Sequence, residues 1–223
     1  MTDGPSHAPQ RRRLAFAREL PVLVLIAFGL ALLIKTFVVQ AFFIPSESME
    51  RTLHGCKGCS GDRVLVNKLV YDVRDIRRGE IVVFNGIDSW TPDTGKDFVK
   101  RVIGLPGDRV ACCTHGHVTV QARGTARPVE LVESYVYQDD HRVFCAAGAS
   151  ESACPAGAPG VLVPPHRLWV MGDHREFSSD SRAHMTDSQH GTIPVGKVIG
   201  RAFVIVWPVH RFRVLSVPKT FGG

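Results

Sequence analysis

The chain has 223 residues, with 27 Lys and Arg residues against 21 Asp and Glu residues, and its formal net charge is +6. Once an N-terminal tail and an apolar segment are set aside, the length is enough for one substantial core, or for a core with an insertion. The positive charge does not indicate nucleic-acid binding. Beyond the N-terminal arginines, the Lys and Arg residues are scattered and form no run interleaved with aromatic residues.

The N-terminal tail contains two different stretches. Residues 1–10 contain Gly, Pro, Ser and His without periodicity and are predicted to be disordered. Residues 11–19 carry four arginines and form a basic collar in front of the apolar segment. Because positive charge collects on the cytoplasmic side of a membrane span, this collar predicts a cytoplasmic N-terminus and an extracytoplasmic catalytic part.

The apolar segment has the pattern of a membrane anchor. Residues 20–34 are all apolar, Gly or Pro, and residues 37–44 are apolar except for Gln40. Together the two blocks are long enough to cross ~30 Å of hydrocarbon. A buried core helix is disfavoured by this apolarity, and a cleavable signal peptide by the lack of a small-x-small site after Ile34. We therefore predict one transmembrane helix over residues 20–40 in the cytoplasmic membrane.

The remaining chain is predicted to be mainly β and largely antiparallel. Stretches with alternating or β-branched apolar residues predict strands, and no helical period of useful length appears after the anchor. The predicted strands cover residues 63–68, 81–84, 98–103, 110–120, 168–171 and 202–207. Between residues 122 and 165 the composition shifts to Ala, Gly, Pro, Ser and charge, which predicts a loop-rich β insertion. The predicted divisions are a tail (1–19), an anchor (20–40), a catalytic core in two parts (41–121 and 166–212), the insertion (122–165) and a C-terminal tail (213–223).

A serine stretch follows the anchor directly and reads Ile-Pro-Ser-Glu-Ser-Met-Glu-Arg-Thr-Leu over residues 44–53. Serine needs a base to become a nucleophile, and Lys100 is the obvious candidate. Its neighbours Phe98 and Val99 on one side, and Val102 and Ile103 on the other, provide an apolar setting. Burial there would lower the pKa of the amine, and a neutral lysine can act as a general base.

Four segments in this order resemble the conserved boxes of bacterial type I signal peptidases. They are the serine stretch, residues 61–71, the Lys-Arg-x-x-Gly-x-Pro-Gly-Asp box at 100–108, and the Gly-Asp box at 172–182. The resemblance implies a Ser48 nucleophile and a Lys100 base, with Arg101 bracing the fold. It also implies an oxyanion hole made by the Ser46 hydroxyl and the Ser48 N–H, a lysine-orienting Ser178, and a supporting pair, Asp180 and Arg182.

The resemblance also implies the substrate. Preproteins would be cut after a small residue, with small side chains at positions −1 and −3, and would bind as an extended strand between the serine stretch and the lysine strand. Preprotein signal peptides and membrane lipid are the expected partners, with a secretion translocon nearby, and no cofactor is expected. The candidate pocket residues are Ile44, Pro45, Met49, Leu53, Phe98 and Val99.

The chain departs from the family pattern at five positions. Glu47 stands where Gly is frequent, Arg51 stands where Pro is usual, and His174, Glu176 and Phe177 lie in the last box. These departures leave the substrate groove undefined.

Three other catalytic arrangements fit the residues less well. A Ser-His-Asp relay through His174 and Asp173 is disfavoured, because adjacent residues on a strand point to opposite faces. Penicillin-recognising acyltransferases place a lysine three residues after the serine, where this chain has Arg51. Self-cleaving repressors share the dyad but need a DNA-binding domain.

The six cysteines allow a different hypothesis, that of an anchored thiol-redox or binding domain built on Cys56 and Cys59. A zinc site with His115 and His117 would lack a second knuckle, so no metal is predicted. An exterior location favours disulfides. The soft loop between Cys145 and Cys154 makes these two the best pair, whereas the pairing of Cys56, Cys59, Cys112 and Cys113 stays open.

Overall fold

The computed structural model describes residues 10–33, 38–87, 89–91, 96–145 and 160–222. The chain divides into two compact units, residues 1–40 and residues 41–223.

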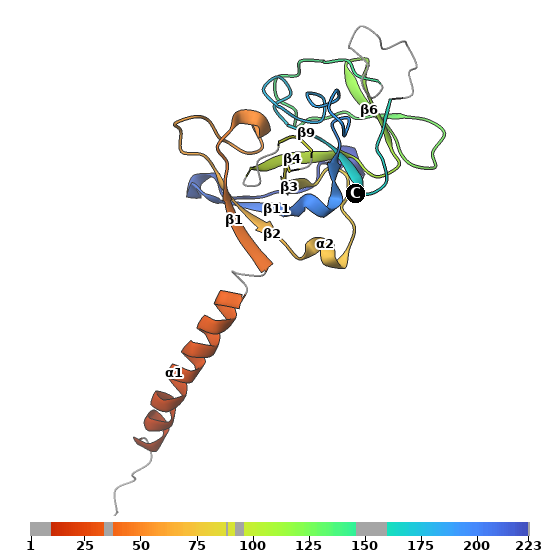
Figure 1. Ribbon diagram of the computed structural model, residues 1–223. Helices are drawn as coiled ribbons and strands as arrows, with labels where there is room; N and C mark the ends of the chain where they lie inside the picture. Colours follow the sequence, from red (N-terminus) through yellow and green to blue (C-terminus); the bar gives the residue numbers. More distant parts are fainter. Residues whose placement is uncertain (1–9, 34–37, 88, 92–95, 146–159, 223) are drawn as a thin grey trace, which may run out of the picture. The chain divides into compact units, whose positions relative to one another are not determined.

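The first unit contains helix α1, Gln10–Leu33, which includes Pro21 (Figure 1). Among the residues that the structure describes, no helix is long and apolar enough to span a membrane. The prediction of one continuous helix to residue 40 needs correction at its end, because strand β1 begins at Val39. Residues 34–37, which lie between the two elements, are outside the described part of the chain.

The second unit is mainly β, and its larger sheet has eight strands, which we call the catalytic sheet. The strand order is β1-β2-β11-β3-β4-β9-β10, with β12 paired to β11, and the registered pairings from β2 to β10 and β12 are antiparallel. The strands are β1 (Val39–Phe43), β2 (Arg63–Asn67), β3 (Ile81–Asn85), β4 (Asp97–Gly104), β9 (Arg167–Met171), β10 (Ile193–Pro194), β11 (Val198–Trp207) and β12 (Arg213–Val214).

A second sheet has four strands in the order β7-β6-β5-β8, all antiparallel. It consists of β5 (Arg109–Thr114), β6 (His117–Gln121), β7 (Val129–Glu130) and β8 (Val161–Leu162). Residues 109–121 therefore pair with the strands of the insertion, whereas the composition shift at residue 122 predicts that they belong to the first part of the core. A strand pattern identifies a strand but does not say which sheet it joins.

Helical structure in the second unit is short. Among the described residues it comprises α2 (Val70–Val73) and four 3₁₀ turns, η2 (Glu47–Met49), η4 (Val195–Lys197), η5 (Val209–Arg211) and η6 (Lys219–Phe221). The absence of a longer helical period from the sequence is thus matched by the described structure, and a largely antiparallel β fold is confirmed.

The serine stretch is fixed by an apolar cluster on one side of the catalytic sheet. Ile44, Met49 and Leu53 are buried there against strands β2, β3 and β11, and the cluster comprises Ile44, Met49, Leu53, Val64, Val66, Ile81, Val83, Ala202, Ile205 and Leu215. Fully burying one such side chain contributes ~1.5–3 kcal/mol relative to leaving it exposed. Met49 and Leu53 therefore hold the residues between them and β1 in a set position.

Candidate active site

Ser48, the expected nucleophile, lies in the middle of the short turn η2. We call residues 47–53, which begin with this turn, the nucleophile turn. The Glu50 N–H donates to the Glu47 carbonyl at 3.0 Å, and the Leu53 N–H donates to the Met49 carbonyl at 2.7 Å. Because Met49 is buried next to it, Ser48 keeps a small exposed fraction of 8% while its backbone is held from both sides.

Gly172 allows a second segment to approach this turn closely. A Cβ atom at position 172 would lie 2.4 Å from the Ser48 carbonyl oxygen and 2.2 Å from the Ser178 hydroxyl, distances that only glycine can accommodate. The His174 N–H then donates to the Ser48 carbonyl at 3.2 Å. Residues 172–178 are in this way attached directly to the nucleophile turn.

Lys100 and Ser48 are brought together as predicted. The Lys100 Nζ and the Ser48 Oγ are 2.7 Å apart, and the Lys100 side chain, on β4, is only 4% exposed. Burial lowers the pKa of the amine from 10.5 to about 8, although the carboxylates of Asp180 and Asp173 act in the opposite direction. An amine with that pKa is available in its neutral form near physiological pH, and it can then accept the proton of the serine hydroxyl.

Ser46 also lies close to Ser48. Its Oγ is 3.3 Å from the Ser48 Oγ, and its backbone is extended where it enters η2. A hydroxyl at this distance can turn toward a carbonyl oxygen of a substrate attacked by Ser48, as the predicted oxyanion-hole role requires.

Asp180 and Arg182 form the predicted ion pair. The Arg182 Nε and Nη2 donate to the two Asp180 carboxylate oxygens at 2.9 Å each, and the Gly172 N–H donates to the same carboxylate at 2.9 Å. Burial opposes charge on Asp180, but Arg182 and these hydrogen bonds outweigh it and lower the carboxyl pKa. The pair thereby fixes the backbone at Gly172, beside Ser48.

Ser178 does not make its predicted contact. Its hydroxyl is buried, and among the described residues it makes no hydrogen bond to the Lys100 amine, so the expected orienting bond is not formed. The hydroxyl nevertheless lies against Gly172, within the segment that is attached to the nucleophile turn. It faces the Asp180 carboxylate and helps to lower the pKa of that carboxyl.

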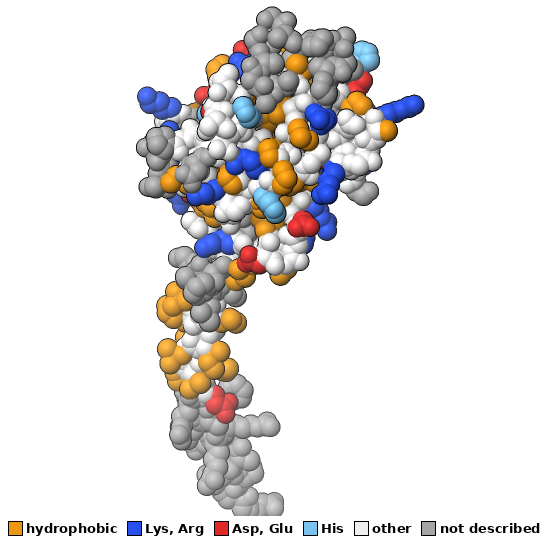
Figure 2. Space-filling view, turned by 45° about the vertical axis from the view of Figure 1, so that its right-hand side comes forward, with side chains coloured by type: hydrophobic (Ala, Val, Ile, Leu, Met, Phe, Trp, Pro, Cys, Tyr) orange, Lys and Arg blue, Asp and Glu red, His pale blue; other side chains and the backbone are white. Residues whose placement is uncertain are grey.

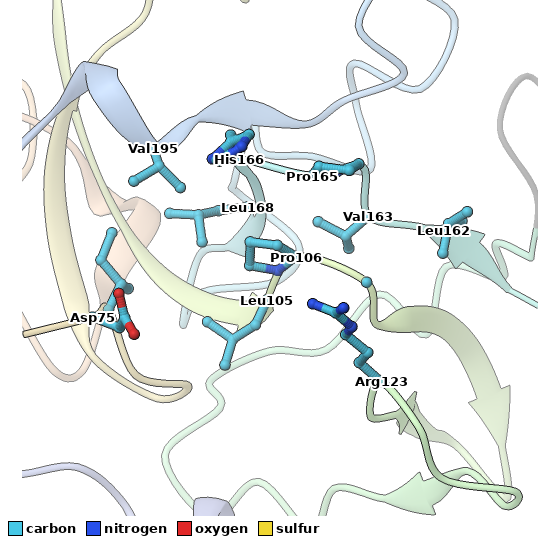
Figure 3. Close-up of a pocket in the computed structure, with 12 residues that line it drawn as sticks. Asp75, Leu105, Pro106, Arg123, Leu162, Val163, Pro165, His166, Leu168 and Val195 are labelled. Carbon is cyan, nitrogen blue, oxygen red and sulfur yellow. The ribbon is translucent and has the colours of Figure 1, made fainter.

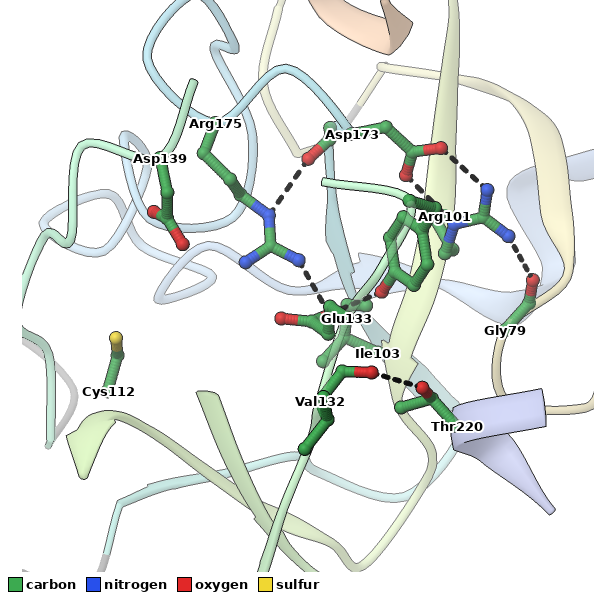
Figure 4. A network of polar contacts seen from close by, with 12 residues as sticks. Gly79, Arg101, Ile103, Cys112, Val132, Glu133, Asp139, Asp173, Arg175 and Thr220 are labelled. Atoms are coloured by element: carbon green, nitrogen blue, oxygen red, sulfur yellow. Dashed lines mark hydrogen bonds and ion pairs between the residues drawn. The ribbon is translucent and has the colours of Figure 1, made fainter. Parts of the chain in front are cut away.

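Arg101, which follows Lys100 in the chain, braces the site through a buried ion pair with Asp173. Its Nε and Nη2 donate to Asp173 at 2.8 and 2.6 Å, and its Nη1 donates to the Gly79 carbonyl at 2.7 Å (Figure 4). Thr52 donates to the same carboxylate at 2.5 Å, so the end of the nucleophile turn is connected to this network. The guanidinium also lies 4.1 Å from the centre of the Tyr135 ring.

The insertion contributes residues that sequence reasoning missed. Glu133 accepts a bond from Arg175 at 2.6 Å, and Asp140 accepts one from Arg182 at 2.6 Å, so both anchor the Gly-Asp box from outside (Figure 4 shows the first pair). No motif or apolar pattern in the loop-rich segment distinguishes these acids from its other polar residues. Only the fold identifies them.

The predicted pocket residues do not form one open groove. Ile44, Met49 and Leu53 are buried core residues, Val99 packs against them with partial exposure, and Pro45 is exposed. Phe98 belongs instead to a different cluster, where its ring lies 5.7 Å from that of Phe84. The structure therefore keeps Pro45, Ile44 and Val99 near the nucleophile turn and assigns Phe98 to the opposite side of the sheet.

The alternative relay through His174 is excluded by its contacts. Its ring Nδ1 lies 3.1 Å from the Glu47 carbonyl oxygen and its Nε2 lies 2.7 Å from Gln138. Asp173, the acid of that hypothesis, is engaged by Arg101.

The cysteines pair locally. Cys56 is bonded to Cys59, and Cys112 to Cys113, so none of the four is available as a thiolate ligand. Cys145 is in a disulfide, but Cys154, its predicted partner, lies outside the described residues. Within the described part of the chain, no group of His, Cys, Asp and Glu side chains is arranged to hold a metal ion.

A pocket of about 830 Å³ lies between the turn after β4 and the start of β9, away from Ser48 and Lys100 (Figure 3). Leu105, Val163 and Leu168 surround it with apolar side chains, while Asp75 and Arg123 lie at opposite sides. Its lining includes neither Ser48 nor Lys100, so pocket size alone does not locate the chemistry.

Comparison with known proteins finds similar sequences over most of the chain. The family model described as "Signal peptidase, peptidase S26" matches residues 17–207. The chain is 36% identical to "Signal peptidase I" of Mycobacterium tuberculosis, covering 93% of this chain and 78% of the relative. It is 37% identical to "Probable signal peptidase I" of Mycobacterium leprae, covering 87% and 77%. A crystal structure of a signal peptidase I from Enterococcus faecalis aligns over 58% of this chain and 97% of that chain, at 22% identity and a TM-score of 0.38.

Proposed function

Because the chain belongs to the signal peptidase I family, peptidase S26, and is a serine peptidase of signal peptides, we propose that Ser48 is its nucleophile and Lys100 its general base. The observation that carries this proposal is the 2.7 Å contact between the Ser48 hydroxyl and a buried lysine amine whose pKa is lowered to about 8.

The reaction follows from that contact. Neutral Lys100 takes the proton of Ser48 as the Ser48 oxygen attacks the carbonyl carbon of the bond to be cut. The Ser46 hydroxyl and the Ser48 N–H stabilise the resulting oxyanion. The Lys100 ammonium then gives its proton to the leaving amine, and the mature protein departs with a new N-terminus. Water, deprotonated by Lys100, hydrolyses the acyl-enzyme and restores the free serine.

The sheet offers a place for an extended substrate beside Lys100. Strand β9 pairs with β4 only from Arg101 onward, whereas β3 pairs with residues 97–101 on the other side. Among the described strands, residues 97–100 are therefore paired along one edge only. A substrate strand added along the open edge would run past Lys100 and Ser48 and place alternate side chains toward Val99, Ile44 and Pro45. Small side chains at −1 and −3 suit this restricted space.

The location of the enzyme is part of the proposal. The apolar run of residues 20–34 would anchor it in the cytoplasmic membrane, with the basic collar inside and the catalytic unit outside. The described side chains of α1 from Leu20 to Leu32 are mostly apolar and exposed (Figure 2). In the catalytic unit, strands β11 and β12 and the turn between them also expose large apolar side chains: Trp207, Val209, Phe212 and Val214. Such a surface suits contact with lipid, and export would place a translocon nearby.

The test is direct. Purified protein is incubated with an exported preprotein, and the new N-terminus of the product is sequenced. One cut after a small residue is expected, and it should be absent with Ser48→Ala or Lys100→Ala. The exposed residues Ser188 and Lys57 provide the matched controls, Ser188→Ala and Lys57→Arg. A cut of undiminished rate with Ser48→Ala would exclude the assigned nucleophile.

Protease accessibility tests the orientation. Protease added outside cells from which the wall has been removed should digest the chain beyond residue 40 and leave the collar intact. Protection of the entire chain would contradict the proposed topology.

A further inference from the structure

Several departures from the family pattern gather around one pocket. Glu47 and Arg51 of the nucleophile turn line a pocket of about 520 Å³ together with His174 and Phe177. These residues come from two segments far apart in the sequence, which meet where the His174 N–H donates to the Ser48 carbonyl. The pocket therefore begins next to Ser48, and four of its lining residues depart from the family pattern.

The aromatic wall of the pocket is held in place by several contacts. The His174 ring is bonded to the Glu47 carbonyl and to Gln138, at 3.1 and 2.7 Å. The centre of the Tyr137 ring, in the insertion, lies 4.8 Å from that of His174, and the centre of the Phe177 ring, three residues further along the chain, lies 4.9 Å from it. Phe177 is 60% exposed, so one aromatic face is open to a bound side chain.

The charges of the pocket favour a cation. Glu47 is exposed, and its carboxylate has no hydrogen-bond or ionic partner among the described residues. Glu50 is a second carboxylate, which accepts bonds from His54 at 2.5 Å and from the Gly55 N–H at 3.1 Å. The pocket therefore has two carboxylates in its lining and one guanidinium, that of Arg51.

Arg51 is already engaged by an aromatic ring. Its guanidinium carbon lies 4.4 Å from the centre of the Tyr137 ring, a cation–π contact. Glu47 is therefore the charged side chain of the pocket that is most available to a substrate, and the open Phe177 ring adds a surface that also attracts cations.

The pocket is separate from the residues expected to hold the signal peptide, since its lining includes none of Ile44, Pro45, Met49 and Val99. A substrate whose signal portion lies against those residues has its cleaved bond at Ser48. The residues after the cut are then the ones left to reach a pocket whose lining includes Glu47, next to Ser48 in the chain, and His174, which is bonded to the Ser48 carbonyl. On the basis of the proposed function, we propose that this pocket binds a Lys or Arg side chain among the first three residues after the cleaved bond.

Peptide substrates test this specificity. A series with one signal portion carries Lys, Gln or Glu at each of the first three positions after the cut. At one of these positions, kcat/KM should be about five-fold higher with Lys than with Gln, and lower with Glu, as expected for a partly exposed ion pair with an aromatic contribution. High salt should reduce the preference, because it screens exposed charges.

Variants assign the preference to Glu47. Glu47→Lys should reverse the order of the Lys and Glu peptides, and Glu47→Gln should weaken it. Arg51→Gln should increase the preference for Lys. The matched control is Glu176→Gln. It removes an exposed carboxylate from the segment that carries His174 and Phe177, but not from the pocket lining. This variant should preserve the wild-type ratio of kcat/KM between the Lys and Gln peptides.

The outcomes separate the two proposals. Equal cleavage of all the peptides, or a Lys preference that Glu47→Lys leaves unchanged, would overturn the pocket assignment while the peptidase assignment stands. Failure of the wild-type protein to cut any peptide or preprotein would overturn the proposed function, and the pocket inference with it.

Discussion

The catalytic sheet and the second sheet differ in how they treat charge. Around the catalytic sheet, charged side chains such as Lys100, Arg101, Asp173 and Asp180 are buried. The second sheet instead packs on an apolar cluster of residues such as Phe144 and Trp169, and its ion pair, His115 with Glu130, is exposed.

This difference shows where the protein accepts an unfavourable environment. A buried charge is costly unless a partner of opposite charge lies beside it. Near the dyad, Arg101 is paired with Asp173, and Arg182 is paired with Asp180. Lys100 is the exception, since its side chain donates a hydrogen bond to the neutral hydroxyl of Ser48. Charge is thus buried where chemistry uses it, while the second sheet relies on apolar packing.

The strongest test of the contrast is removal of the dyad. Ser48→Ala or Lys100→Arg should lower kcat/KM by ~10⁴-fold or more, since nucleophile and base act as a unit and a guanidinium stays protonated. The melting temperature of Ser48→Ala should stay close to that of wild type. An active Lys100→Arg enzyme would show that another group is the base.

Breaking the buried pair beside the dyad should affect stability most. Asp173→Ala leaves Arg101 buried without its carboxylate and should lower the free energy of unfolding by ~3–5 kcal/mol. Glu130→Ala removes an exposed carboxylate from the second sheet and should change it by less than ~0.5 kcal/mol. Urea unfolding of both variants measures the contrast, and equal losses would contradict it.

Ser46→Ala should give an intermediate effect on rate. Loss of one oxyanion donor typically lowers kcat ~10²–10³-fold, with little change in stability for an exposed residue. Single-turnover cleavage of a signal-sequence peptide is the measurement. A wild-type rate would remove Ser46 from the oxyanion hole.

The pH dependence follows from the lowered pKa of Lys100, which is about 8. Only the neutral amine accepts a proton, so kcat/KM should rise about ten-fold per pH unit below that pKa and level off above it. Because half of the amine is neutral at pH 8 and about one hundredth of it at pH 6, the rates at these two pH values should differ roughly 50-fold. A flat profile down to pH ~5 would assign the base to another group.

The smallest effect on catalysis is expected in the second sheet. Replacement of Cys112 and Cys113 by Ser should lower the melting temperature, because Cys112 is buried in its apolar cluster, and should change kcat/KM less than about two-fold. A much larger loss of kcat/KM would contradict the contrast between the two sheets.

The predictable part of the site is the part carried by local motifs. Ser48, Lys100, Asp180 and Arg182 each lie in a short box whose residue types suit their chemistry, and the fold brings them together. The partners from the insertion, such as Glu133, could not be predicted, because a lone acid in a polar loop has no distinguishing pattern. Ser178 was assigned by resemblance, and its expected bond is not formed.

Strands were predictable more readily than sheets. Alternation of apolar residues located β2, β3, β4 and β9 within a residue or two. The assignment of β5 and β6 to the second sheet depends on their pairing with β7 and β8, which are two-residue strands too short to produce a pattern. Pairing between distant segments is decided by packing, which a single sequence does not display.

The buried amine of Lys100 also has a thermodynamic consequence. In the unfolded chain an ordinary lysine holds its proton up to about pH 10.4, whereas the folded site releases it near pH 8. At neutral pH the charged amine therefore destabilises the native state by roughly 3 kcal/mol, and this penalty fades as pH rises between the two values. Methionine has similar length without the charge, so Lys100→Met should unfold at a higher temperature than wild type. Selection for heat resistance alone would enrich inactive enzymes at this position.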